Sequence, residues 1–242
     1  MDFIFKKDES SKFIFLSVGE FLLVIFLMIA TSVALFLYLP FIFQKFLFGY
    51  EAFLKSHYFG IILSLVSSLL NLVIIYFFVC KRKNKTIQEG FFLNPLSSKA
   101  LLISILAGII MPLISLPIIF KFAPSQFYAM DMAKTKSGLI YLFTGALLAP
   151  VCEEIFFRGY IFPFFQSKLN SFWAVILTAL FFGVSHYMNI GNAHILLSLF
   201  IFYGFVLTLL RYYSNSLLSP MLAHFLHNLT LIVSFLFVSS KG

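Results

Sequence analysis

The sequence predicts an all-α fold, a polytopic membrane helical bundle of about seven (six to eight) transmembrane helices. Three observations support this class: the apolar fraction, the abundance of phenylalanine, and the recurrence of long apolar runs. Of 242 residues, 61% are apolar, 11% are charged and 35 are Phe. A water-soluble domain cannot bury that much apolar surface, because much of any folded surface faces water. The composition therefore excludes a disordered chain and a soluble enzyme, and lipid must solvate the excess.

Apolar runs approaching or exceeding the roughly 20 residues needed to cross a bilayer recur along the whole chain. The first is too long for a signal-peptide core and lacks a small-residue cleavage site, so we expect it to stay in the mature protein as a helix. The later runs are shorter or interrupted. The expected helices are 14–39, 58–80, 100–120, 138–162, 172–188, 194–210 and 217–238.

The segments between these helices read as connections rather than as domains. Residues 81–99 predict a loop with a short interfacial helix, and residues 121–137 a loop on the opposite side of the membrane. We expect one integral membrane domain over 1–242, divided into N-terminal helices and loops, 1–137, and catalytic motif-bearing helices, 138–238.

The net charge of +8 indicates orientation rather than a nucleic-acid partner, which we do not expect. Lys and Arg gather in the cytoplasmic loops of membrane proteins. With the N-terminus inside, eleven of the seventeen Lys and Arg residues, Arg158 among them, lie on the cytoplasmic side, and Lys81–Lys85 is their densest run. The prediction is a multi-pass cell-membrane protein with a cytoplasmic N-terminus. Its oligomeric state does not follow from the sequence.

An ionisable side chain at the centre of a span costs at least about 2.5–3.5 kcal/mol, so each one needs a reason. Glu20 stands alone near one end of the first span and is expected to reach the interface or to stay protonated. Asn71, in the second, is expected to form a helix–helix hydrogen bond.

Glu153 and Glu154 lie together in an apolar helix, and Arg158 follows four residues after the second. A spacing of four puts Glu154 and Arg158 on one helix face, where they can pair and orient their helix without touching substrate. Such a pair could also simply anchor a helix end. Glu153 is rotated by about 100° and faces elsewhere. A buried carboxylate without an ionic partner suits a general base.

Two further polar clusters follow in later spans. His186 lies near the end of the fifth, and His224 and Asn228 share a face of the last. One histidine in a span is usually a packing residue, but Glu153 and these three side chains can converge on one cavity, which we expect to open toward the cytoplasm. Straight helices with the expected ends would hold His186 deeper than the others, so we expect either a deeper start of the fifth helix or tilts and a broken helix.

These three motifs resemble, in order, those of the CPBP family of intramembrane endopeptidases. This is the CAAX-protease and bacteriocin-processing family, also called Abi. The resemblance covers about 138–238 and implies hydrolysis of a peptide bond in a membrane-associated peptide or protein, with or without a lipid anchor, near the cytoplasmic side of the bilayer. The matching residues are Glu153-Glu154-x-x-x-Arg158, Phe182-x-x-x-His186 and His224-x-x-x-Asn228.

Peptide hydrolysis needs a nucleophilic water, a proton donor for the leaving amine and a stabilised oxyanion. We expect Glu153 to deprotonate the water and to pass that proton to the amine. His186 and His224 would hold the water or stabilise the intermediate, and Asn228 would donate to the oxyanion. The resemblance implies the same roles for these four residues.

No cofactor is expected to be required, and zinc is the alternative. His186 and His224 with Glu153 could form a catalytic zinc site with an open position. Using Glu153 as a ligand would leave the general base unassigned, and no His-Glu-x-x-His element is present. Members of the family have been described both as metalloproteases and as glutamate-dependent proteases.

Two other classes of function stay open. A proton-coupled transporter could use the carboxylates and histidines as a relay. It would predict inverted repeats and broken helices in both halves, whereas the polar groups here gather after residue 140. A non-catalytic immunity or binding protein would carry the same motifs without using them.

Overall fold

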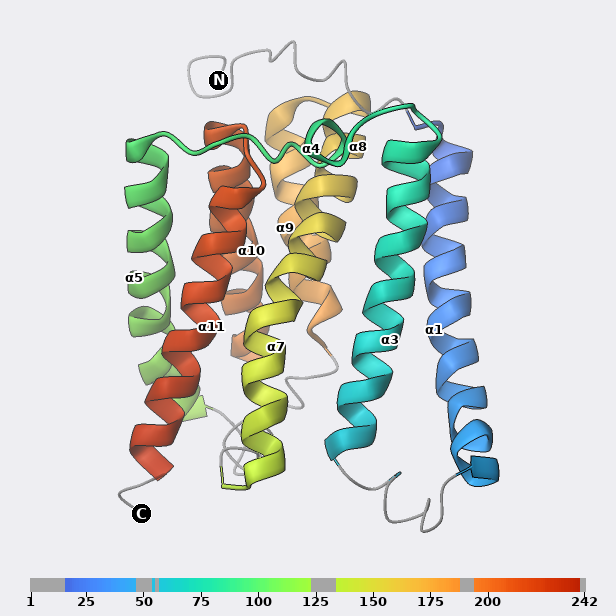
Figure 1. The fold of residues 1–242 in the computed structure, drawn as a ribbon. Helices are drawn as coiled ribbons and strands as arrows, with labels where there is room; N and C mark the ends of the chain where they lie inside the picture. Colours follow the sequence, from blue (N-terminus) through green and yellow to red (C-terminus); the bar gives the residue numbers. More distant parts are fainter. Residues whose placement is uncertain (1–15, 47–53, 55–56, 123–133, 188–193, 240–242) are drawn as a thin grey trace.

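The computed structural model describes residues 16–46, 54, 57–122, 134–187 and 194–239. Figure 1 shows the long helices of this part running side by side as a bundle. The prediction of a polytopic helical bundle is confirmed. The fifth expected helix is α9 (Ser171–Ser185), which is apolar but shorter than the rest. Six stretches of the described part are long and apolar enough to span a membrane: Val18–Lys45, Tyr58–Lys81, Ser98–Phe122, Lys136–Lys168, His194–Ser214 and Leu218–Phe237.

The first motif lies in a helical segment that runs further than expected. α7 (Lys136–Glu154) continues into a π-helical segment, Ile155–Ile161, and then into α8 (Phe162–Lys168). Pro163 does not end it, because it falls in the first turn of α8, where a proline is tolerated. The π-helical segment begins directly after the two carboxylates. Such segments are rare inside α-helices and frequently occur at functional sites.

This extension explains why Glu153 and His186 can lie at the same depth. Glu153 is 15 residues from Lys168, and His186 is 15 residues from Ser171, where α9 begins just after α8 ends. Two antiparallel helices that share a turn bring positions equally far from it to the same level. The mismatch expected from the sequence arose because we ended the first of these helices at residue 162.

α11 (Leu218–Ser239), which bears the last motif, begins inside the protein rather than at its surface. Leu217, just before it, is fully buried, and its N–H donates to the carbonyl of Phe92 at 2.9 Å. The deeper start was predicted for the fifth helix, whereas the burial of Leu217 concerns the start of α11.

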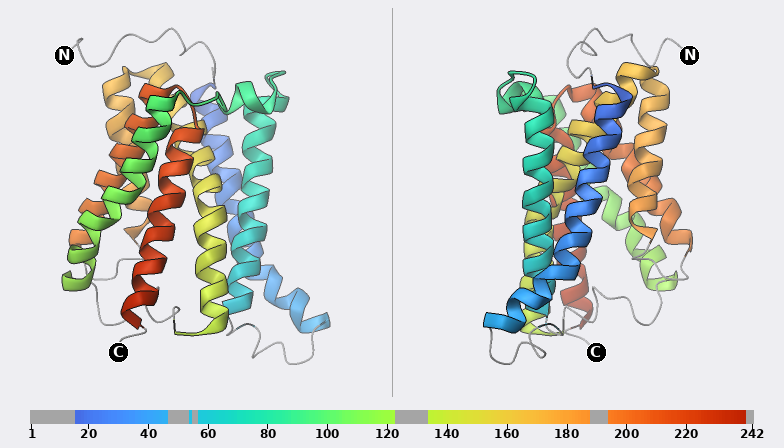
Figure 2. Two further views of the ribbon diagram at one scale, coloured as in Figure 1. Left: turned by 60° about the vertical axis from the view of Figure 1, so that its left-hand side comes forward. Right: turned by 90° about the vertical axis from the view of Figure 1, so that its right-hand side faces the viewer.

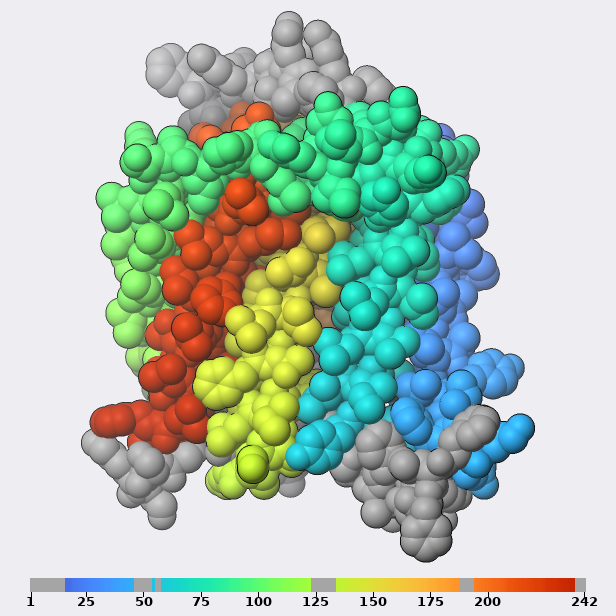
Figure 3. All heavy atoms as spheres, viewed as in Figure 1, coloured from blue at the N-terminus to red at the C-terminus, as the bar shows by residue number. Residues whose placement is uncertain are grey.

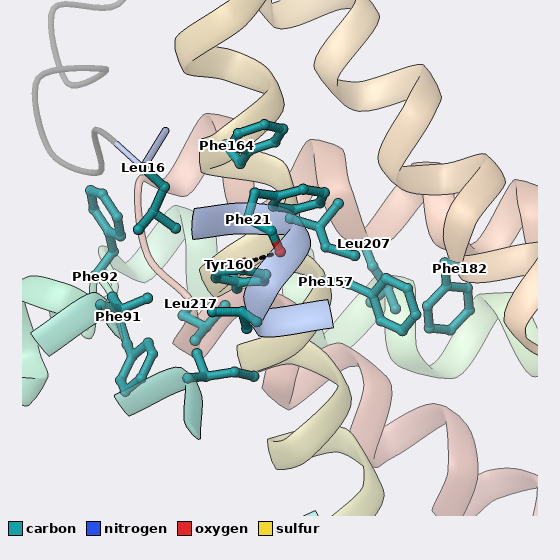
Figure 4. Close-up of a cluster of buried hydrophobic side chains, with 14 of the residues drawn as sticks. Leu16, Phe21, Phe91, Phe92, Phe157, Tyr160, Phe164, Phe182, Leu207 and Leu217 are labelled. Atoms are coloured by element: carbon teal, nitrogen blue, oxygen red, sulfur yellow. Dashed lines mark hydrogen bonds between the residues drawn. The ribbon is translucent and has the colours of Figure 1, made fainter. Parts of the chain in front are cut away.

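The short helix and loop between α3 (His57–Tyr76) and α5 (Ser98–Phe122) pack into the bundle. α4 (Ile87–Gly90) is the short helix that the sequence predicts in this segment, but Phe91 and Phe92 after it are buried. They belong to an apolar cluster with Phe21, which stacks on Phe164 at a centroid distance of 3.9 Å (Figure 4). The cluster joins α1 (Val18–Phe46), α8 and the loop at one end of the bundle.

Charged residues pair at this same end of the bundle, the upper one in Figure 1, where α1 begins. Glu20 lies at the start of α1 and pairs with Arg82 at 3.1 Å and Lys83 at 3.7 Å. Arg158 does not belong to this group. We placed it on the cytoplasmic side, but its side chain is fully buried within the bundle, and the acidic partner described below explains why.

Prolines and a glycine shape two of the helices. The last turns of α1 point away from the rest of the helix in Figure 2, where Pro40 removes a backbone hydrogen bond. α5 packs closely against α11 at Gly108. A Cβ there would lie 2.7 Å from both the carbonyl oxygen of Ala223 and the Cβ of Leu226, so this approach requires glycine.

Candidate active site

A buried ion pair lies within the motif helix, and its arginine also contacts α10 (His194–Ser214). Arg158 Nη1 donates to Glu154 Oε1 at 2.9 Å, and both side chains are 0% exposed. Arg158 also donates to the carbonyl of Gly204 at 2.8 Å and to the hydroxyl of Thr208 at 3.2 Å, and its guanidinium lies 4.5 Å from the ring centroid of Phe182. The intrahelical pair predicted from the spacing is confirmed. Its further contacts satisfy a charge that would otherwise be costly to bury.

Glu154 also orients His224 on α11. The carboxylate oxygen that accepts from Arg158, Oε1, lies 2.8 Å from His224 Nδ1. An ionised carboxylate can only accept, so this contact places the ring proton on Nδ1 and leaves a lone pair on Nε2 when the imidazole is neutral. Glu154 therefore orients a histidine as well as its own helix, which the sequence did not indicate.

His186 is oriented in a similar way by a backbone carbonyl. It caps the C-terminal end of α9, and its Nδ1 lies 2.8 Å from the carbonyl oxygen of Phe182. A carbonyl oxygen only accepts, so Nδ1 again carries the proton and Nε2 presents a lone pair. The ring stacks on Phe200 of α10, with centroids 4.5 Å apart, which fixes its plane.

The two oriented imidazoles meet at Glu153. Its Oε2 lies 3.8 Å from His186 Nε2 and 4.0 Å from His224 Nε2. These distances are too long for direct hydrogen bonds. Glu153 Oε2 is buried and has no hydrogen-bond partner within the described part of the chain. Glu153, His186 and His224, expected to converge from three helices, do so.

Glu153 opens onto a cavity of about 330 Å³. The cavity lies between α7 and its π-helical extension, the end of α9, and α1 and α3. Figure 3 shows α7 and α3 side by side on one face of the molecule. The lining residues are Met28, Ser68, Asn71, Leu72, Ile75, Cys152, Glu153, Phe156, Phe157, Ser185 and His186.

Asn228 is not brought to this cavity. It lies one turn after His224 on α11 and is half-buried, but it does not line the cavity, and its side chain makes no hydrogen bond to any residue that the structure describes. His227, on the neighbouring face, stacks on Tyr203 at a centroid distance of 4.1 Å. It lies in a separate, mostly apolar pocket between α5, α10 and α11.

Two polar residues of α3 belong to the site and were not predicted there. Ser68 and Asn71 line the same cavity as Glu153. We expected Asn71 to hydrogen-bond a neighbouring helix, yet its Oδ1 is buried without a partner among the residues described. The available signal was their spacing of three, which puts two polar groups on one face of an apolar helix.

The donor set is a poor match for zinc in its present geometry. Across residues 16–46, 57–122, 134–187 and 194–239 no group of three or more His, Cys, Asp or Glu side chains is placed to hold a metal. Two ligands of a tetrahedral zinc with bonds of about 2.0–2.1 Å lie roughly 3.4 Å apart. The distances of 3.8 and 4.0 Å around Glu153 exceed this, so the three side chains would have to move closer together.

Comparison with known proteins supports the resemblance seen in the motifs. Residues 135–230 match the family model described as Rce1-like, type II CAAX prenyl endopeptidase. No match was found among curated proteins or among solved structures. The match is consistent with a CPBP-family intramembrane protease, a multi-pass protein that acts on a membrane-associated protein substrate in the bilayer. The matched segment contains all six predicted site residues, whereas α1, α3 and α5 lie outside it.

Proposed function

We propose that this protein is an intramembrane endopeptidase in which Glu153 activates a water held beside His186 and His224. The observation that supports this most directly is the convergence of Glu153 Oε2 and the two imidazole Nε2 atoms, which lie 3.8 and 4.0 Å from it. With Glu153 ionised, all three atoms are hydrogen-bond acceptors. A water admitted between them would donate its hydrogens to two of them and keep an oxygen lone pair for attack.

The reaction then proceeds with two uses of one carboxylate. Glu153 takes a proton as the water oxygen attacks the carbonyl carbon of the scissile peptide bond. The tetrahedral intermediate collapses, the carbon–nitrogen bond breaks, and Glu153 returns the proton to the leaving amine. His224, held by Glu154, and His186, held by its backbone carbonyl, position the water without reorganising during the reaction.

Asn228 is proposed to donate to the oxyanion. Its position one turn along the His224 face supports this role only for a substrate that extends along α11 from the cavity, because Asn228 does not line the cavity itself. An Asn228→Ala variant with unchanged cleavage would remove it from the mechanism.

We further propose that the end of the bundle bearing Arg82, Lys83 and Lys168 faces the cytoplasm, since basic residues mark that side. The N-terminus would then be cytoplasmic. The substrate would be a membrane-associated peptide or protein cleaved near this side.

The test is cleavage by purified protein in lipid nanodiscs. A farnesylated, internally quenched peptide with a CAAX terminus is the first probe, because of the family model, and its unprenylated counterpart is the second. We expect Glu153→Gln and His186→Ala to lower kcat by at least about 10²–10⁴ with unchanged thermal unfolding. Glu89→Gln, at an exposed carboxylate in α4, is the control and should cleave normally. Wild-type cleavage by well-folded Glu153→Gln would end the proposal.

We propose that this reaction requires no metal. Protein purified without chelators should contain zinc well below one equivalent, and chelator treatment should leave cleavage of the farnesylated probe unchanged. Stoichiometric zinc whose removal abolishes cleavage and whose return restores it would replace the metal-free mechanism with a zinc mechanism.

A further inference from the structure

We infer that Asn71 of α3 binds the backbone of the substrate beside Glu153. The inference rests on the proposed endopeptidase function and deepens it. It places a substrate-binding residue outside residues 135–230, which match the family model and contain the six predicted site residues. The catalytic cavity would then be completed by the N-terminal half of the chain.

The unsatisfied amide of Asn71 is the first observation. Its Oδ1 is buried and has no hydrogen-bond partner within the described part of the chain, although it lies in a membrane-spanning helix. Buried polar groups in native proteins are nearly always paired, because an unpaired one loses its hydration without compensation. A partner from outside the protein would remove this cost.

The position of Asn71 indicates which partner that would be. Asn71, Glu153 and His186 line one cavity, so a peptide bond placed for attack at Glu153 lies within the space that Asn71 borders. A substrate segment that is unwound for cleavage exposes its N–H and C=O groups, and few groups in a membrane interior can satisfy them. The Asn side chain offers both an acceptor and donors. Its Oδ1 would accept from a substrate N–H near the scissile bond, and its amide nitrogen would donate to a substrate carbonyl.

Neighbouring polar groups of α3 already have partners. Ser68, one turn before Asn71, lines the same cavity as Cys152 and interacts with its side chain. Ser67 hydrogen-bonds Ser32 of α1 at 2.9 Å and does not line the cavity. Ser67 is therefore a polar residue of α3 whose side chain serves a helix–helix hydrogen bond and does not face the cavity. This makes it a matched control for Asn71.

The experiment pairs variants with backbone-edited substrates. The probe is the farnesylated, quenched CAAX peptide, made also as a series in which one amide N–H at a time, except at the scissile bond, is replaced by an ester oxygen. In the wild-type protein we expect one ester position to lower kcat/KM by about tenfold, the size of one lost hydrogen bond. Asn71→Leu should cleave the all-amide probe about tenfold more slowly and show no further loss with that ester.

Controls separate this role from a structural one. Asn71→Leu removes an unpaired polar group, so its thermal unfolding temperature should be equal to or above that of the wild type. Asn71→Ala is the second variant should the leucine disturb packing. Ser67→Ala should show the wild-type pattern of ester effects.

The outcomes are distinct. An Asn71→Leu protein with wild-type kcat/KM, or with the same ester penalties as the wild type, would overturn the role of Asn71 while the protease stands. A wild-type protein that cleaves none of the probes, or a Glu153→Gln variant that cleaves them normally, would overturn the proposed function and this inference with it.

Discussion

Replacing Arg158 with Met should destabilise the protein severely. Arg158 is fully buried and donates to Glu154, Gly204 and Thr208. Met has similar length but no charge, so Arg158→Met leaves the Glu154 carboxylate buried with His224 as its remaining partner. Removing one member of a buried ion pair costs about 3–5 kcal/mol, because the other charge loses its compensation.

The double variant Glu154→Gln/Arg158→Met distinguishes this cause from loss of packing. Without the carboxylate there is no uncompensated charge, so the double variant should recover at least about 1 kcal/mol of the loss in Arg158→Met. The assay is equilibrium unfolding in mixed detergent micelles, followed by helical circular dichroism. An Arg158→Met protein within about 1 kcal/mol of the wild type, or a double variant with additive losses, would refute the electrostatic account.

Two further predictions concern packing and pH. Gly108→Ala should lower the free energy of unfolding by about 1–3 kcal/mol, because the added methyl group would lie 2.7 Å from the carbonyl oxygen of Ala223. Gly145→Ala is the control: no atom lies within 4 Å of its added Cβ, so it should be neutral or slightly stabilising in the same assay. The pKa of the Glu89 carboxyl is lowered from 4.5, chiefly by the hydrogen bond from the Thr86 backbone N–H and also by the one from the Thr86 hydroxyl. The stability that this cap gives to α4 is therefore fully present above pH 4.5 and is lost as the pH falls through the pKa of Glu89 in the folded protein. An NMR titration of Glu89 should give a midpoint below 4.5 that rises in Thr86→Ala, and a midpoint at or above 4.5 in the wild type would contradict this.

Local spacing predicted much of the candidate site. The separation of four positions from Glu154 to Arg158 fixes a shared helix face, and the 100° between Glu153 and Glu154 fixes separate ones. The structure shows both, as well as the approach of His186 and His224 to Glu153. These features depend on helical periodicity and on the cost of polar groups in lipid, and both can be obtained from one sequence.

Features that depend on contacts between distant segments were missed. Hydropathy alone does not reveal a π-helical segment or a proline that is tolerated at the start of α8. The helix that carries Glu153 was therefore predicted to end at residue 162, and the depth of His186 seemed inconsistent with that of Glu153. The bond from His224 to Glu154 joins residues 70 positions apart. The place of Asn71 in the cavity depends on how α3 packs against α7. The amide was visible in the sequence, but its neighbours were not.

In the proposed mechanism water attacks the substrate directly, and Glu153 only moves its proton. This is tested by a single turnover with excess protein in water enriched in oxygen-18, followed by mass spectrometry of the new carboxyl terminus. Oxygen-18 should appear in that carboxylate during the first turnover, and the tryptic peptide containing Glu153 should stay unlabelled. An unlabelled product with oxygen-18 in the Glu153 carboxylate would show that Glu153 itself attacks the substrate, and would contradict the mechanism.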